Sequence, residues 1–191
     1  MVDSQGIVMN CPVCKKAELS FKQLESNLAS LSCPNCRGNW IQGAQYWKWL
    51  EQHGENLPEL KDKTDDLPLA ETQEHIDCPE CGWRMVKYMV GRGVGFTFDH
   101  CHGCKGIWLD RNEWEVLRKR NLHDDLHSIL TEFWQGEALK EERKKRLERI
   151  YINKFGVDDY AEIKRIRAWL SERQKKQELL AYLTDEDPLD V

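Results

Sequence analysis

Two copies of one cysteine pattern constrain the fold of this chain more than any other feature. CPVC at 11–14 returns as CPEC at 78–81, and CPNCRGNW at 33–40 returns as CHGCKGIW at 101–108. The copies read Cys-x2-Cys-x18-Cys-x2-Cys and Cys-x2-Cys-x19-Cys-x2-Cys, spacings typical of four-cysteine zinc sites. We therefore expect two structural zinc ions, one held by Cys11, Cys14, Cys33 and Cys36, the other by Cys78, Cys81, Cys101 and Cys104.

The residue types explain this expectation. A Cys-x-x-Cys turn aims two thiolates at one point, and two such turns complete a tetrahedral site with no open position for water. A redox-active cysteine pair and an iron centre with four thiolates remain alternatives. A catalytic zinc is disfavoured because four cysteines fill the coordination sphere. His100 and His102 flank Cys101, but the four cysteines already suffice as ligands.

Each interval between cysteine pairs is long enough for a β-hairpin. In the second copy, Val94, Phe96 and Phe98 alternate with smaller or polar residues, which is typical of a strand with one apolar face. We expect strands at 85–90 and 94–99, and less clearly at 18–24 and 28–32. A short helix is expected after each copy, over 45–50 and 113–117.

Tryptophans follow both copies in the motif Gly-x-Trp. We expect Trp40 and Trp108 to cover the metal sites and exclude solvent, with stacking on nucleic-acid bases as the alternative. In the helix at 45–50, Tyr46 and Trp49 face inward, which leaves Trp47 pointing outward as a candidate contact residue.

The remaining composition suggests several small units. The net charge is −5, and residues 57–77 alone carry seven acids against two bases. We expect a first zinc ribbon in 1–56, an acidic linker in 57–77 that leaves the ribbons mutually mobile, a second ribbon in 78–122 and a helical region in 123–191. Residues 1–10 resemble no secretory signal, so we expect a cytoplasmic protein with reduced cysteines and no membrane partner.

The last third has the pattern of an α-helical hairpin joined near Gly156, followed by an acidic tail. Residues 140–149 hold six bases and three acids, and residues 164–176 hold six bases and one acid. These charges are either a solvated helix surface or a phosphate-contacting patch. The candidate nucleic-acid contacts are Arg143, Lys144, Lys145 and Arg146.

The second copy resembles the bacterial zinc-ribbon family called the transcription factor IIB-type zinc finger. Met85 and the run GIWLD at 106–110, followed by Glu113, match its pattern. The first copy matches less well, since Ile41-Gln42 replaces Leu-Asp and Gln45 replaces the acid. The resemblance implies zinc ligation by the cysteines and a loose association with transcription or nucleic acid. It does not reach the last third of the chain.

Together these features predict a small metal-stabilised α+β protein: two tandem zinc ribbons followed by an α-helical hairpin. We expect a non-enzymatic zinc-binding adaptor or regulator that contacts nucleic acid or a transcription or translation complex. The alternative is a protein–protein scaffold whose hairpin docks on a partner without nucleic acid. An enzyme is disfavoured, because the sequence has no recognisable nucleophile–base motif, phosphate-binding glycine loop or open metal site.

Overall fold

The computed structural model describes residues 8–53 and 67–188. They form two compact units, one within residues 1–141 and the other within residues 142–191. Across the described residues, no helix has both the length and the apolar character needed to cross a membrane. The first unit contains both cysteine repeats.

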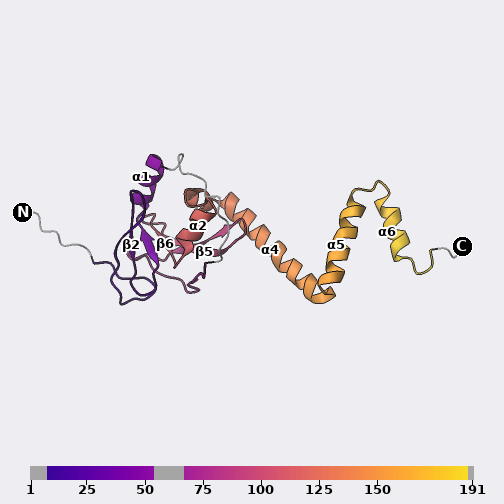
Figure 1. Cartoon of the computed structure of the whole chain (residues 1–191), viewed down its shortest axis with the longest axis horizontal. Helices are drawn as coiled ribbons and strands as arrows, with labels where there is room; N and C mark the ends of the chain where they lie inside the picture. Colours follow the sequence, from indigo (N-terminus) through magenta and orange to yellow (C-terminus); the bar gives the residue numbers. More distant parts are fainter. Residues whose placement is uncertain (1–7, 54–66, 189–191) are drawn as a thin grey trace, which may run out of the picture. The chain divides into compact units, whose positions relative to one another are not determined.

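Each repeat folds as a hairpin, a short third strand and a helix (Figure 1). The first repeat forms β1 (Ser20–Glu25), β2 (Leu28–Ser32), β3 (Asn39–Ile41) and α1 (Gly43–His53). The second forms β4 (Val86–Gly91), β5 (Val94–His100), β6 (Ile107–Leu109) and α2 (Glu113–Lys119). The predicted hairpins and helices are confirmed, with boundaries moved by up to three residues.

The turns of the two hairpins need backbone conformations with positive φ. Asn27 turns the first hairpin at φ 64°, and Arg92 and Gly93 turn the second at φ 49° and 80°. Asparagine and glycine adopt this region more readily than other residues, so Asn27 and Gly93 suit these turns.

The two ribbons share one sheet, with strand order β1-β2-β3-β6-β5-β4. β3 pairs antiparallel with β6, and Trp40 lies directly opposite Trp108 in the register. The expectation that the linker leaves the ribbons mutually mobile is therefore wrong. The third strand of each copy would otherwise be an edge of its own sheet, and pairing β3 with β6 removes these two edges from solvent. The four predicted domain boundaries themselves stay a prediction.

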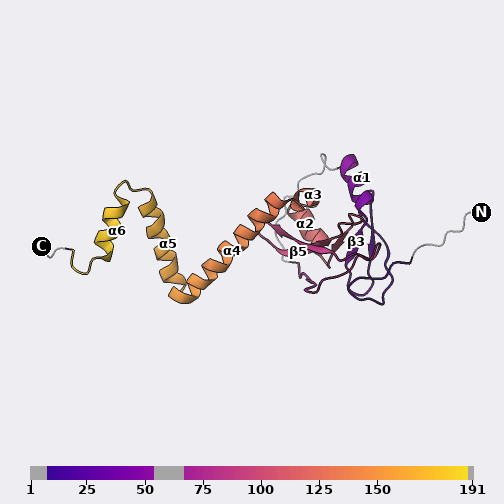
Figure 2. The same cartoon turned by 180° about the vertical axis from the view of Figure 1, so that it is seen from behind.

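The shared sheet separates two apolar clusters, because successive residues of a strand point to opposite faces. On one face, Ile41, Ile107 and Leu109 pack with Trp49 and Trp114 from α1 and α2. On the other face, Trp40 and Trp108 pack with the cysteines. In both views α1 and α2 lie to the same side of the labelled strands (Figures 1 and 2). The helices thus cover one face and the metal sites the other.

The segment after the second repeat extends the helical side of the first unit. It contains α3 (Leu126–Ile129) and the start of α4 (Glu132–Phe155). The Tyr46 hydroxyl donates to the carbonyl of His123 (3.1 Å) and accepts from the amide of Leu126 (3.2 Å). The Trp134 indole donates to the carbonyl of Val90 (2.7 Å). Both links fix the helices against the ribbons.

The described part of the predicted linker, residues 67–77, lies against the second ribbon. The amide of Thr72 donates to Asp110 Oδ2 (2.6 Å), and Asn112 Nδ2 donates to the carbonyl of Pro68 (2.8 Å). Ile76 is buried beside Met85 in the metal-side cluster. This part is extended as expected but attached to the ribbon through hydrogen bonds to the buried Asp110 and the partly exposed Asn112. Residues 57–66 lie outside the described residues.

The second unit consists of the end of α4, then α5 (Val157–Ser171) and α6 (Lys176–Thr184). The predicted junction at Gly156 is confirmed, where φ is 86°. Across it, Lys164 Nζ lies 2.7 Å from Glu148 Oε1, and Tyr151 stacks on Tyr160 with ring centroids 6.4 Å apart. These contacts hold the two helices together near their junction.

The glycines of the two Gly-x-Trp motifs test the importance of the shared sheet. A Cβ at Gly106 would lie 2.2 Å from the Trp40 ring, and a Cβ at Gly38 would lie 2.2 Å from the Trp108 ring. We expect Gly106→Ala to lower the free energy of unfolding by about 1–3 kcal/mol, as overpacking does in rigid cores. Denaturant unfolding of the zinc-loaded protein measures this.

The control is Gly95→Ala, because a Cβ at Gly95 would have no neighbour within 4 Å. This variant should unfold at the denaturant concentration of the parent protein or above it. If Gly106→Ala were as stable as Gly95→Ala, the close approach of the two ribbons would not exist in solution.

Candidate metal centres

The structure brings the eight cysteines together in the two groups that the spacing predicts. Within each group the four Sγ atoms all lie within 4.8 Å of one another. The first group includes the pairs Cys11–Cys36 at 3.6 Å and Cys14–Cys33 at 3.8 Å. Zinc–sulfur bonds of about 2.3 Å place the sulfurs of a tetrahedral site about 3.8 Å apart. The first group therefore fits one zinc ion.

The second group is slightly tighter. Its pairs include Cys78–Cys104 at 3.5 Å and Cys81–Cys101 at 3.3 Å. All eight cysteines are free, and these separations exceed the ~2.05 Å of a disulfide. Each group can hold a zinc ion as a structural crosslink between two turns of the chain. Neither four-sulfur group includes His100 or His102.

All four Cys-x-x-Cys turns have one backbone geometry. The residue after the second cysteine has positive φ in each: Lys15 at 65°, Arg37 at 62°, Gly82 at 76° and Lys105 at 63°. Its amide donates to the carbonyl of the first cysteine of the turn, at 2.8 to 3.0 Å. The turn thus reverses the chain while both thiols point to the same side, which is what shared ligation requires.

Burial and backbone amides act in opposite directions on the thiols. Burial raises the pKa of Cys11 to about 11 and that of Cys104 to about 11. The backbone N–H of Trp83 lowers the pKa of Cys81 to about 7. The amides of Gly38 and Gly106 donate to the sulfurs of Cys36 and Cys104. Because buried thiols release protons only with difficulty, a metal cation must displace those protons on binding.

Trp40 and Trp108 lie beside these cysteines and are fully buried, each with 0 % exposure. Their predicted role in covering the metal sites is confirmed, and burial leaves neither ring available to stack on a base. Each ring also packs on the glycine of the Gly-x-Trp motif in the opposite ribbon, Trp40 on Gly106 and Trp108 on Gly38. These reciprocal contacts depend on β3 pairing with β6, which the cysteine spacing does not predict.

The two copies differ around these tryptophans. The Trp108 indole donates to Asp110 Oδ1 (2.9 Å). Gln42 occupies the equivalent place in the first copy, and Trp40 Nε1 has no hydrogen-bond partner among the described residues. The second copy, which matches the family pattern more closely, therefore has contacts that the first copy lacks. Asp110 accepts hydrogen bonds from both the Trp108 indole and the Thr72 amide, whereas Gln42 accepts none from Trp40.

Glu113 completes the second copy from the first turn of α2. It is fully buried, and its Oε2 accepts a hydrogen bond from the amide of Asp110 (2.7 Å). Oε1 has no partner among the described residues. Burial, reinforced by the nearby Asp110 carboxylate, raises the pKa of Glu113 well above its ordinary value. The side chain is therefore stable here as a neutral carboxylic acid.

The four basic candidates lie on α4 and are all exposed. Arg143 and Arg146 are three residues apart and share a face, but four successive helical residues together span most of the helix circumference. The structure thus places Arg143, Lys144, Lys145 and Arg146 around the helix instead of gathering them on one face. Trp47 on α1 is half-exposed, as expected of a residue on the outward side of this helix.

We expect the purified protein to contain two zinc ions per chain, and Cys101→Ser to bind one. Because β5 and β6 connect the second metal site to the first ribbon, this variant should also destabilise the first ribbon. Elemental analysis gives the stoichiometry, and amide NMR spectra report each ribbon separately. Iron in the native protein, or a first ribbon with unchanged amide shifts in the variant, would contradict this account.

Glu113→Gln tests the neutral carboxyl. The folded chain retains a proton that the unfolded chain releases above the ordinary pKa of 4.5, so the free energy of unfolding should fall as the pH rises, by at most about 1.4 kcal/mol per pH unit. Glutamine has nearly the same shape, keeps an acceptor for the Asp110 amide and does not titrate. The variant should therefore be at least as stable as the parent near neutral pH and lack this component of the pH dependence.

The measurement is denaturant unfolding of the zinc-loaded proteins at about pH 6 and about pH 8. Thiol titration affects parent and variant alike, so their difference isolates residue 113. Glu51→Gln, which removes an exposed carboxylate from α1, is the control. A large loss of stability in Glu113→Gln alone would show that the carboxylate is charged and has a partner.

Residues 77–120 match the family described as Transcription factor zinc-finger. This match contains the second four-cysteine group and ends within the turn after α2. No curated protein and no solved structure matches the chain. The second ribbon is thus similar to a transcription-factor zinc finger, and the first ribbon repeats its cysteine arrangement on the other half of the same sheet.

Proposed function

We propose that the protein is a non-enzymatic zinc-binding adaptor or regulator that contacts nucleic acid or a transcription or translation complex. The observation that carries this proposal is the exposed basic run on α4. Arg143, Lys144 and Arg146 form no ion pair with any residue that the structure describes. Cations without internal partners are available to phosphates, the groups that dominate protein–nucleic acid affinity.

The neighbouring bases provide a contrast. Lys140 pairs with Glu137, Arg149 with Glu142 and Arg165 with Glu162. Those charges are already partly neutralised within the helices, as expected of a solvated helix surface. Arg143, Lys144 and Arg146 differ from these bases because they form no such pair with a residue that the structure describes.

The metal sites support a role without catalysis. Four sulfurs fill the coordination sphere of a tetrahedral zinc ion, so no position remains where water or substrate could be activated. The similarity of residues 77–120 to transcription-factor zinc fingers points in the same direction. A zinc-binding unit followed in the chain by helices with exposed bases suits recognition of a partner.

A protein–protein scaffold is the second candidate, favoured by the apolar residues of the second unit. Among its described residues Leu170 is the one buried hydrophobic side chain. Several large hydrophobic side chains are exposed instead: Leu147, Ile150, Tyr151, Phe155, Val157, Ile163, Trp169, Tyr182 and Leu183. Exposed apolar surface of this kind marks interaction sites, so a protein partner could cover it.

Replacing Arg143, Lys144, Lys145 and Arg146 with glutamine tests the first candidate. We expect weaker binding to RNA or DNA, with a similar loss for different sequences, because phosphate contacts carry no base information. The slope of log affinity against log salt should become shallower by up to about 3, if all four bases contact phosphates of a single strand. Fluorescence anisotropy with labelled oligonucleotides at several salt concentrations measures both quantities.

A matched variant replaces Lys15, Lys16, Lys48 and Arg120, four exposed bases of the first unit, and removes the same charge. If both variants lost affinity equally, only net charge would matter. Unchanged affinity in the α4 variant, with its helical circular-dichroism spectrum intact, would move the contact surface elsewhere. No binding by the native protein even at low salt would favour the scaffold.

A further inference from the structure

A cavity of about 330 Å³ lies in the first unit, where the two ribbons and α3 meet. α1 of the first ribbon supplies Tyr46 and Trp47, and the second ribbon supplies residues of β4, β5, β6 and its last cysteine turn. α3 contributes His127. Neither ribbon could form this cavity alone, so it exists only because the ribbons share a sheet.

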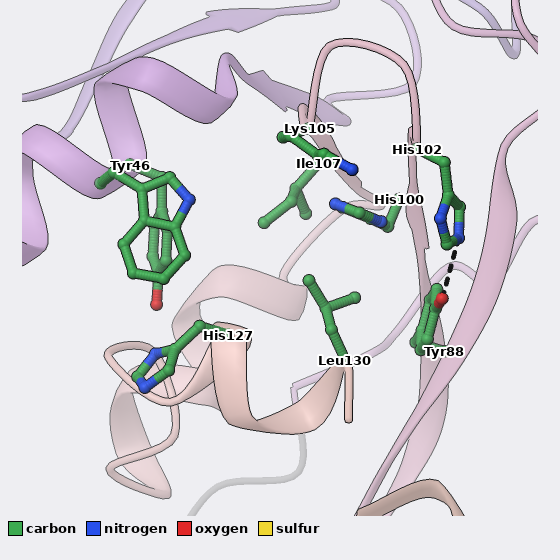
Figure 3. Close-up of a pocket in the computed structure, with 9 residues that line it drawn as sticks. Tyr46, Tyr88, His100, His102, Lys105, Ile107, His127 and Leu130 are labelled. Atoms are coloured by element: carbon green, nitrogen blue, oxygen red, sulfur yellow. Dashed lines mark hydrogen bonds between the residues drawn. The ribbon is translucent and has the colours of Figure 1, made fainter. Parts of the chain in front are cut away.

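Aromatic rings form the two walls of the cavity. Figure 3 shows Tyr46 and His127 on one side and Tyr88, His100 and His102 on the other. The Trp47 ring lies beside His127, with centroids 5.6 Å apart, and is 47 % exposed. Tyr88 and His102 are hydrogen-bonded to each other at 2.9 Å, which fixes the opposite wall. Such a cleft suits a flat ring that stacks on side chains.

The charged side chains of the cavity indicate which charge a ligand should carry. No lining residue carries a carboxylate, and Lys105 is the one lysine or arginine among them. Lys105 is exposed and forms no ion pair with any residue that the structure describes. The ligand should therefore carry a negative charge beside its flat ring.

Two imidazole nitrogens also lack partners. His100 is 6 % exposed, and its Nδ1 has no hydrogen-bond partner among the described residues; the same is true of His127 Nδ1. Buried polar atoms are rarely left unsatisfied. Both nitrogens are closed off from solvent, so they lie behind the cavity wall, and the surface that a ligand can touch is formed by the rings and Lys105.

We propose that this cavity binds one unstacked base of a single-stranded nucleic acid, with the adjoining phosphate at Lys105. Sequence-tolerant single-strand binding combines base stacking on aromatic side chains with cations along the backbone, and the cavity offers both. This inference rests on the proposed contact with nucleic acid and adds a base-binding site in the first unit, distinct from the basic run on α4.

Trp47→Ala is the first test, made in the zinc-loaded full chain with a fluorescein-labelled oligouridine and its oligodeoxythymidine counterpart. Loss of a stacking platform should weaken binding about tenfold with little change in salt slope, since no charge is removed. The control is Trp169→Ala, which removes a tryptophan of similar exposure (42 %) from α5. Equal affinities of the two variants would overturn the proposal.

Lys105→Gln tests the phosphate contact against Arg37→Gln, which alters the same position of the first ribbon and removes the same charge. Both residues have positive φ after the second cysteine of a turn, but only Lys105 lines the cavity. Lys105→Gln should reduce affinity more than Arg37→Gln and lower the salt slope by up to about 1. Equal losses would overturn the assignment of a phosphate to Lys105.

Photo-crosslinking locates the base directly. A strand containing 4-thiouridine should crosslink to peptides that contain Trp47, Tyr88 or His127. Crosslinks confined to α4 and α5 would overturn the cavity site while leaving nucleic-acid binding intact. Displacement of the strand by an equal concentration of uridine monophosphate would overturn a single strand as the ligand. No binding of any strand by the native protein would overturn the proposed nucleic-acid contact together with this site.

Discussion

The pairing of β3 with β6 is the interaction on which the first unit depends. Three residues of each strand join two zinc ribbons into one sheet. The tryptophan at the centre of each strand packs on the Gly-x-Trp glycine of the other ribbon. The helices then cover one face with a shared core that neither ribbon could form by itself. In small zinc domains the metal usually compensates for a core too small to fold. Here the metals and the joint core act together.

The sequence predicts the local features of this arrangement well. Cysteine spacing identifies both four-cysteine groups, alternation identifies the β4–β5 hairpin, and Gly156 identifies the helical junction. These features are local, since they arise from residues close together in the chain. The union of the ribbons is not local, because an acidic, proline-containing segment between two complete motifs is equally compatible with separate domains.

Some signals of the union were nevertheless present. The third strand of each copy is short and mostly apolar, Asn-Trp-Ile and Ile-Trp-Leu, as expected of a strand that is covered on both faces. Glycine before each tryptophan also has a second explanation, because the approach of another ring leaves no room for a Cβ. The cavity could not be predicted, since its residues come from five helices and strands and one cysteine turn and converge only in the joint fold.

The divergence of the two copies follows from this union. The second copy keeps Asp110 and Glu113, which order the segment at Thr72 and the start of α2. The first copy has glutamine at both places and instead supplies Trp47 to the cavity. The second copy thus retains the hydrogen bonds of the motif, while the first copy contributes an exposed tryptophan to the cavity.

Two similar halves facing each other across paired strands resemble a symmetric dimer, yet here both halves lie in one polypeptide. A dimer separates into monomers on dilution, and identical subunits must present identical surfaces. Fusion removes both restrictions. The joined sheet persists at any protein concentration, and a substitution in one half has no obligatory copy in the other. An asymmetric cleft can therefore form beside an almost symmetric core.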